Sequence, residues 1–137
     1  MGCHHKTLSF RSNAHEQVID ITREVEACVR DSGASDGICL VYTPHATAAI
    51  AINENDDPNI GTDLLRALAK AVPQRDGWLH DRVDGNAAAH IKSAILGPSE
   101  SIPIAGGKLI LGRWQNVFLL ELDGPRSHRS VQVTIVS

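Results

Sequence analysis

The chain has few aromatic residues, with two Phe, two Trp and one Tyr among 137 residues. Its core must therefore be filled by Val, Ile, Leu and Ala, and a core this small favours further burial by oligomerisation. No run reaches the roughly 18 apolar residues that a membrane-spanning helix needs, and the first ten residues lack the apolar centre of a secretory signal. We therefore predict a single domain, residues 1–137, in the cytoplasm and without a membrane partner.

Neither sign of charge dominates the composition. The chain has 13 Lys and Arg against 16 Asp and Glu, for a formal net charge of -3 at pH 7. Without a global positive field, neither nucleic acid nor an anionic membrane is a favoured partner. The three cysteines form no CxxC pair, which favours reduced thiols over a disulfide framework.

Several catalytic motifs are missing from the sequence. It contains no GxxxxGK[ST] phosphate loop, no GxGxxG dinucleotide motif and no HExxH zinc motif. Each motif carries a specific mechanism for binding phosphate or metal. Nucleotide-dependent chemistry is therefore disfavoured.

The hydrophobic pattern predicts an α+β protein. A capping-box spacing at Asn13 and Glu16, followed by apolar residues at helical intervals up to Gly33, predicts the first helix. Two more helices are predicted over 62–72 and 86–96, and strands over 6–10, 37–43, 48–53, 101–104, 108–111, 114–122 and 130–136. The strands are mostly consecutive, which indicates an antiparallel, sandwich-like sheet with about three flanking helices. We expect strands 37–43 and 48–53 to be neighbours.

The first polar cluster lies in Thr43–Pro58. His45 follows a proline turn, and an acidic run containing Glu54 and Asp57 follows the next predicted strand. If the two strands pair, the imidazole and the carboxylates meet at neighbouring sheet ends, where they suit acid–base work or metal binding. The alternative is a turn histidine and an acidic loop that caps a helix.

The second cluster is HDRVDGNAAAH. His90 lies near the start of a predicted helix, where free N–H groups and the helix dipole favour a phosphate. The spacing from His80 to His90 fits no local metal motif. The alternative makes Asn86 an N-cap and His90 a packing residue.

The third cluster lies in Gly112–Ser130. Trp114 and Gln115 can stack on and hydrogen-bond a planar ring, and Arg129 presents a fixed fork for phosphate. The alternative is a core tryptophan with charged turn residues.

Together, the segments PHATAAIAINENDDP, HDRVDGNAAAHIKSAILGPS and GGKLILGRWQNVFLLELDGPR resemble the YjbQ-type family, called secondary thiamine-phosphate synthase. The resemblance runs from about Thr43 to the C-terminus. It implies a compact sandwich-like homotrimer with polar pockets near subunit interfaces. The family positions matched in this chain are His45, Thr47, Asn53, Glu54, Asp57, His80, His90, Trp114, Gln115 and Arg129. The chain departs from the family pattern at Ala46, where a hydroxyl residue is usual.

The resemblance also implies a reaction, the joining of a pyrimidine diphosphate to a thiazole phosphate with release of pyrophosphate. Arg129, His90 and the helix start at Asn86 would then neutralise the leaving group, with or without Mg²⁺ held by Glu54 or Asp57. Thr47, Asn53, Asn86, Trp114 and Gln115 would bind the phosphorylated substrate.

Two other functions remain open at this point. In a metal-dependent hydrolase, His45, His80 and His90 would converge on Zn²⁺ while Glu54 or Asp57 activates water. In a non-catalytic trimeric binder, the same pocket would hold a phosphorylated small molecule without converting it.

Overall fold

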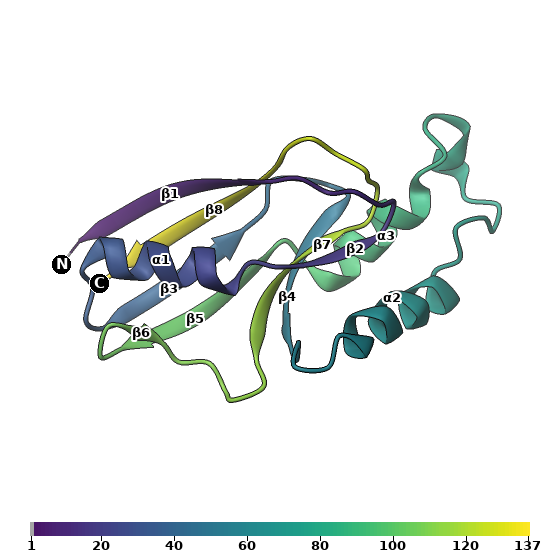
Figure 1. Cartoon of the computed structure of the whole chain (residues 1–137). Coiled ribbons are helices and arrows are strands. Elements are labelled where there is room, and N and C mark those ends of the chain that lie inside the picture. Colours follow the sequence, from purple (N-terminus) through teal and green to yellow (C-terminus); the bar gives the residue numbers. More distant parts are fainter. Residues whose placement is uncertain (1) are drawn as a thin grey trace.

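The computed structural model describes residues 2–137, which form two antiparallel sheets and three α-helices (Figure 1). The five-stranded sheet has the order β1-β8-β3-β5-β6, and the three-stranded sheet has the order β2-β7-β4. The strands are β1 (Cys3–Phe10), β2 (Gln17–Asp20), β3 (Gly37–Tyr42), β4 (Ala48–Asn53), β5 (Ser99–Ala105), β6 (Lys108–Leu109), β7 (Asn116–Glu121) and β8 (Arg129–Val136). The predicted α+β class, with antiparallel strands and three helices, is confirmed.

The helices occupy two different layers. Helix α1 (Thr22–Ser32) packs on the inner face of the five-stranded sheet, while α2 (Asn59–Ala71) and α3 (Ala87–Leu96) cover the three-stranded sheet from the other side. A short 3-10 helix, η1 (Leu79–Arg82), lies in a segment that projects from the body between α2 and α3 (Figure 1). No helix among residues 2–137 is long and apolar enough to cross a membrane.

Strand β7 is buried on both faces and separates two hydrophobic clusters. Val117 and Leu119 face the five-stranded sheet and α1, whereas Phe118 and Leu120 face α2 and α3. A strand with both faces covered reads as a continuous apolar run, as NVFLL does here. This central position lets the last residue of β7, Glu121, enter the interior at one end of the sheet.

Two predictions about the secondary structure are wrong, one about where the first helix begins and one about which strands are neighbours. The first helix begins at Thr22 rather than near Asn13, because Gln17–Asp20 pairs with β7 as a strand and Asp20 Oδ1 accepts from Thr22 N–H at 2.9 Å. Strands β3 and β4 are not neighbours: β3 lies between β8 and β5, and β4 pairs with β7. The apolar pattern specified both strands but could not specify their partners.

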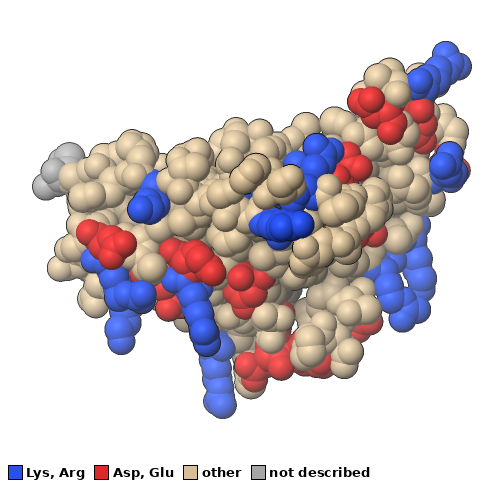
Figure 2. Space-filling model, turned by 45° about the horizontal axis from the view of Figure 1, so that its top comes forward, with Lys and Arg blue, Asp and Glu red and all other residues tan. Residues whose placement is uncertain are grey.

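The surface carries charges of both signs. In the view of Figure 2, acidic and basic side chains alternate and form no extended field of one sign.

The ion pair between Lys92 on α3 and Glu16 in the loop before β2 is largely buried, because Lys92 is only 2% exposed. This pair ties α3 to the edge of the three-stranded sheet and thereby holds the helix that carries His90.

Candidate functional site

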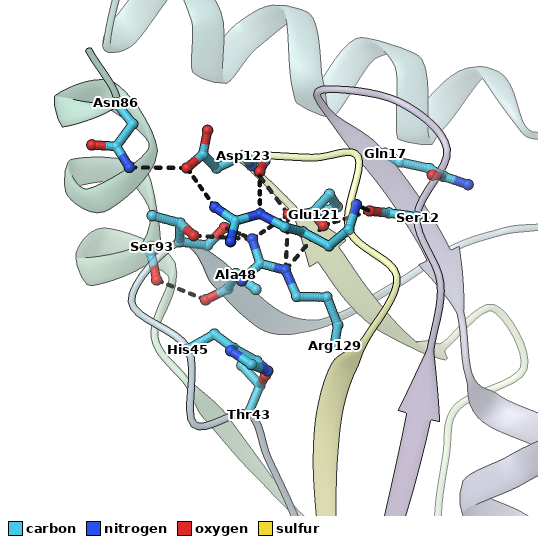
Figure 3. Close-up of polar contacts among 12 residues, drawn as sticks. Ser12, Gln17, Thr43, His45, Ala48, Asn86, Ser93, Glu121, Asp123 and Arg129 are labelled. Carbon is cyan, nitrogen blue, oxygen red and sulfur yellow. Dashed lines mark hydrogen bonds and ion pairs between the residues drawn. The ribbon is translucent and has the colours of Figure 1, made fainter. Parts of the chain in front are cut away.

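A buried ion pair between Glu121 and Arg129 forms the base of the site (Figure 3). Ser12 Oγ donates to Glu121 Oε1 at 2.6 Å, and Arg129 Nε donates to the same oxygen at 2.9 Å. The Arg129 Nη2 group also donates to Thr47 Oγ1 at 2.9 Å. The Glu121 side chain is 0% exposed and that of Arg129 is 3% exposed. The Arg129 guanidinium therefore binds groups inside the protein rather than the phosphate predicted for it.

The surroundings of Glu121 keep it ionised. Burial alone would raise the pKa of this carboxyl, but hydrogen bonds from Arg129, Ser12 and the Asp123 N–H, together with the Arg129 charge, lower its pKa below the ordinary value. Hydrogen bonds to the charged form of a carboxyl and a nearby cation both favour that form. The pair is therefore a fixed element of the fold on which neighbouring groups are positioned.

His45 lies in the turn between β3 and β4, beside this ion pair (Figure 3). The backbone N–H of Ser130 donates to His45 Nε2 at 2.9 Å, and Thr43 Oγ1 donates to the carbonyl of the same Ser130 at 2.9 Å. Because a backbone N–H can only donate, Nε2 must carry a lone pair and the neutral ring must carry its proton on Nδ1. Burial, and then the Arg129 charge, lower the pKa of His45.

This geometry defines what His45 can do. Its Nε2 lone pair is already occupied by the Ser130 N–H, so that nitrogen is not free to accept a proton or ligate a metal. The lowered pKa keeps the ring neutral near pH 7. His45 is therefore suited to donate a hydrogen bond from Nδ1 to a substrate oxygen.

Asn86 and Asp123 form the upper part of the site in Figure 3. Asn86 Nδ2 donates to Asp123 Oδ2 at 2.9 Å, and Arg126 Nη2 donates to the same oxygen at 3.0 Å. The Asn86 Oδ1 atom is buried and has no hydrogen-bond partner among residues 2–137. A buried acceptor without a partner is uncommon, so Asn86 offers this oxygen to a donor that the chain itself does not supply.

The start of α3 is already capped, but not by Asn86. Asp81 Oδ1 accepts from the Ala87 N–H at 3.0 Å, and Asn86 makes no side-chain cap bond. A carboxylate at this position satisfies the helix start and repels a second anion. The start of α3 is therefore less suited to a phosphate than its sequence position predicts.

His80 and His90 lie together. Their ring centroids are 4.8 Å apart and the rings are at 82° to each other, with His80 exposed on η1 and His90 half-buried on α3. His90 is one turn after Asn86 and one turn before Ser93, whose Oγ donates to the Ala48 carbonyl on β4 at 2.7 Å. The flank of α3 that meets β4 thus carries both Asn86 and His90.

The remaining predicted residues lie at the opposite end of the three-stranded sheet. Asn53 pairs with Asn116, whereas Ala48 pairs with Glu121. The five-residue step along β7 corresponds to about 17 Å. Five predicted residues lie about this far from the His45 end of the sheet: Asn53, Glu54, Asp57, Trp114 and Gln115.

The residues of this distant group have local structural partners. Asn53 Oδ1 accepts from Glu54 N–H at 2.7 Å, and Asp57 Oδ1 accepts from Asn59 N–H at 2.9 Å at the start of α2. Gln115 Oε1 accepts from Gly112 N–H at 2.8 Å, and Trp114 is 49% exposed with Arg113 over its ring. Within one chain, the expected meeting of His45 with Glu54 or Asp57 is wrong, because β4 separates them.

The sequence clusters contain Thr43, Glu121 and Asp123 but gave them no role in the site, and Ser12 lies outside all three clusters. One signal was present for Glu121: a single carboxylate ends the apolar run VFLL and precedes another Leu. A charge at such a position needs a buried partner. The sequence did not indicate that this partner is Arg129, because the contact between Glu121 and Arg129 depends on how β7 and β8, which lie in different sheets, are arranged.

The comparisons identify the family. Residues 6–137 match the model described as UPF0047 protein YjbQ-like, and the chain belongs to this family. It is 43% identical over 125 residues to the UPF0047 protein YugU of Bacillus subtilis, covering 89% of this chain and 92% of YugU. It is 44% identical over 124 residues to a UPF0047 protein of Archaeoglobus fulgidus, covering 90% of this chain and 95% of the relative.

Two solved structures share the fold over nearly their whole length. A protein of unknown function from Sulfolobus solfataricus superposes with a TM-score of 0.95 at 37% identity, covering 98% of this chain and 96% of that one. An uncharacterized YjbQ/UPF0047 protein from Clostridium acetobutylicum superposes with a TM-score of 0.92 at 44% identity, covering 96% and 99%. The predicted family is confirmed.

These findings correct the predicted function. The relatives are named only as UPF0047 proteins or as proteins of unknown function, and nothing in those names supports thiamine phosphate synthase activity. The metal-dependent hydrolase is wrong as well, because residues 2–137 contain no group of three His, Cys, Asp or Glu side chains arranged to hold a metal. The Nε2 atom of His45 is already bonded to the backbone of Ser130, which removes one of the three predicted ligands.

Proposed function

We propose that the chain is an enzyme that performs acid–base chemistry on a phosphorylated small molecule at the site formed by His45, Asn86 and His90. The observation that carries this proposal is the Ser130 N–H bond to His45 Nε2. This hydrogen bond holds the imidazole in its neutral form, with the Nδ1–H group directed away from the Ser130 backbone. A fixed donor of this kind stabilises charge that develops on a substrate oxygen without having to reorganise.

The other proposed roles follow from the contacts of each group. His90 and His80, which lie ring against ring, transfer the proton, since neither imidazole is bonded to the backbone as His45 is. Asn86 Oδ1 accepts from a substrate hydroxyl or amine, because this buried oxygen has no partner among residues 2–137. The exposed Arg126, whose Nε donates to the Asp123 carbonyl and whose Nη2 donates to its carboxylate, supplies the cation for the substrate phosphate.

The test is a search for conversion of phosphorylated metabolites, followed by phosphorus NMR, with the natural chain and its variants. For a compound that the natural chain converts, His90→Asn should lower kcat by about 10²–10⁴-fold, the size of a general acid–base contribution. His45→Gln should lower it by about 10²–10³-fold, the size of a lost oxyanion donor. His15→Asn is the matched control, because the His15 side chain is exposed and lies outside the site.

Two results would contradict the proposal. One is that phosphorylated compounds are bound but never converted. The other is a converted compound whose turnover is unchanged in both His45→Gln and His90→Asn.

We also propose that the protein works in the cytoplasm as a homotrimer, the number three resting on the family resemblance. The outer face of the five-stranded sheet is uncovered, and its register places one cation there, Lys108 at the edge, beside uncharged or histidine side chains: Cys3, His5, Thr7, Ser9, Ile38, Leu40, Tyr42, Ser99, Ser101, Pro103, Ala105, Ser130, Gln132, Thr134 and Val136. Identical copies of an acidic chain repel one another least through a face without Asp or Glu. The cytoplasm suits the reduced thiols of Cys28 and Cys39, which are buried.

The assembly makes a direct prediction. Leu40, 36% exposed at the centre of this face, should be buried in the trimer, so Leu40→Asp should reduce the mass in solution from three chains to one chain of 14.8 kDa. Light scattering after size-exclusion chromatography measures this mass. Leu79→Asp is the matched control, since Leu79 is 77% exposed on the projecting segment. A natural chain that runs as a monomer, or an unchanged mass for Leu40→Asp, would contradict the assembly.

A further inference from the structure

A cysteine and a histidine lie side by side on the outer face of the five-stranded sheet. Cys3 and His5 are two residues apart on β1, the edge strand of this sheet, so their side chains share one face. Leu8 and Phe10 of the same strand pack against the core and define the opposite face. The Cys3 Sγ atom lies 3.5 Å from His5 Nε2, and both residues are exposed.

The strand holds this pair in a defined place at the start of the chain. Gly2 N–H donates to the Ser137 carbonyl at 2.9 Å, and Ser137 N–H donates to the Gly2 carbonyl at 3.0 Å. From there β1 pairs with β8 over its whole length. The backbone of the sheet therefore sets the spacing between the Cys3 and His5 side chains.

The separation of the two atoms suits a tetrahedral metal ion. Zn²⁺ binds thiolate sulfur at about 2.3 Å and imidazole nitrogen at about 2.0–2.1 Å, which places two such ligands of a tetrahedral ion about 3.5 Å apart. The observed distance of 3.5 Å between Cys3 Sγ and His5 Nε2 matches this value. The two side chains therefore reach one metal ion without moving apart or together.

Thr134 on β8 orients the imidazole for this role. His5 Nδ1 lies 2.9 Å from Thr134 Oγ1, so a ring with its proton on Nδ1 donates to this hydroxyl and directs the Nε2 lone pair towards Cys3. A histidine that binds a metal almost always donates its other N–H to a neighbouring group in this way. Thr134 is the residue directly opposite His5 in the register of β1 and β8.

The other two thiols of the chain do not compete for a metal. Cys28 and Cys39 are both buried. Burial raises the pKa of Cys39 to about 12 and also raises the pKa of Cys28. Because a thiol binds a metal as the thiolate, Cys3 is the cysteine suited to be a ligand.

We propose that Cys3 and His5 bind one Zn²⁺ ion on the outer face of the sheet. The Cys3 sulfur bonds the ion and its proton passes to solvent, while His5 bonds through Nε2. Among residues 2–137, no third His, Cys, Asp or Glu side chain completes the pair, so water fills the remaining positions. A thiolate and an imidazole favour Zn²⁺ over Mg²⁺ or Ca²⁺, which prefer oxygen ligands.

Isothermal titration calorimetry of the full, tag-free chain with zinc chloride, with the thiols kept reduced, tests the proposal. The natural chain should bind Zn²⁺ and should not bind Mg²⁺. Cys3→Ser and His5→Asn should each weaken Zn²⁺ binding at least about tenfold, and Thr134→Val should weaken it about tenfold through the lost orientation of His5. His4→Asn is the matched control, since His4 lies between the two ligands on β1 but on the opposite face.

Cobalt spectroscopy identifies the ligands independently of affinity. The natural chain and His4→Asn, loaded with Co²⁺, should show a thiolate-to-metal charge-transfer band that Cys3→Ser lacks. Circular dichroism of each variant separates a lost metal ligand from a lost fold.

Three results would overturn the proposal. The first is no Zn²⁺ binding by the natural chain at submillimolar concentration, and the second is binding that is unchanged in both Cys3→Ser and His5→Asn. The third is a loss in His4→Asn as large as that in His5→Asn, which would mark an adventitious ion at the end of the chain. The site of His45 and His90 uses other residues, so its activity has no bearing on this outcome.

Discussion

Replacing Arg129 with Met should destabilise the protein by about 3–5 kcal/mol, the usual cost of leaving one member of a buried ion pair without its partner. The change leaves the Glu121 carboxylate, which is 0% exposed, without the cation that now lowers its pKa. It also removes the bond from Arg129 Nη2 to Thr47 Oγ1. Equilibrium unfolding in urea measures the loss in the free energy of unfolding.

The matched variant removes both charges. Glu121→Leu combined with Arg129→Met should recover most of the lost stability, because apolar side chains of similar size often replace a buried ion pair at little cost. Arg126→Met is the surface control, since the Arg126 side chain is 47% exposed and pairs with Asp123. A loss below about 1 kcal/mol for Arg129→Met alone would show that this ion pair is not the base of the site.

Replacing Gly124 with Ala should destabilise the protein by about 3 kcal/mol, the upper part of the range for overpacking. A Cβ at this position would overlap the Ala14 carbonyl oxygen and would lie 2.8 Å from Glu121 Cγ and 2.9 Å from Ser12 Oγ. The backbone after β7 must then shift, which disturbs the Ser12 bond to Glu121. Thermal and urea unfolding both detect the change.

Gly61→Ala is the control for this prediction. Gly61 lies in α2, and an added Cβ meets only the Val18 side chain, whose nearest atom, Cγ2, is 3.4 Å away, an ordinary contact. Alanine also favours a helix over glycine by about 1 kcal/mol, so this variant should be as stable as the natural chain or more stable. Equal stability of Gly124→Ala and Gly61→Ala would contradict the close packing around Glu121.

The hydrophobic pattern predicted most elements but not their pairing. Strand β4 was predicted at its observed bounds, and Gly33 ends α1 in the left-handed conformation expected of it. The pattern misplaced the start of α1, since Val18 and Ile21 fit a helical spacing while β2 gains its hydrogen bonds from β7. Pairing between distant strands depends on the whole fold and leaves no local trace in the sequence.

The site was predicted only in part for the same reason. His45, Thr47 and Arg129 do meet, through the Ser130 backbone and the Thr47 hydroxyl. Glu54 and Asp57 were expected beside them only because β3 and β4 were expected to pair. The length of β4, from Ala48 to Asn53, carries these carboxylates to the other end of the sheet, whichever strand β4 pairs with.

The roles of individual residues depend on details that a sequence does not contain. Arg129 has the features of a phosphate-binding residue, but its guanidinium is turned to Glu121 and Thr47. His45 has the features of a base or a metal ligand, but its Nε2 atom receives the Ser130 N–H. In both cases the partner is a group far away in the sequence, and that partner decides the chemistry.

The proposed chemistry depends on the protonation state of His45, and nitrogen-detected NMR of the imidazole groups over pH 5–8 measures that state most directly. We predict a neutral His45 ring at pH 7, with its proton on Nδ1 and a lone pair on Nε2, and a pKa below the ordinary value of about 6.5 because of burial and the Arg129 charge. Because the pKa is lowered, half of the His45 rings should be protonated only at a pH below about 6.5. A ring protonated on Nε2 at pH 7, or a His45 pKa at or above about 6.5, would contradict the donor role of His45 and with it the proposed chemistry.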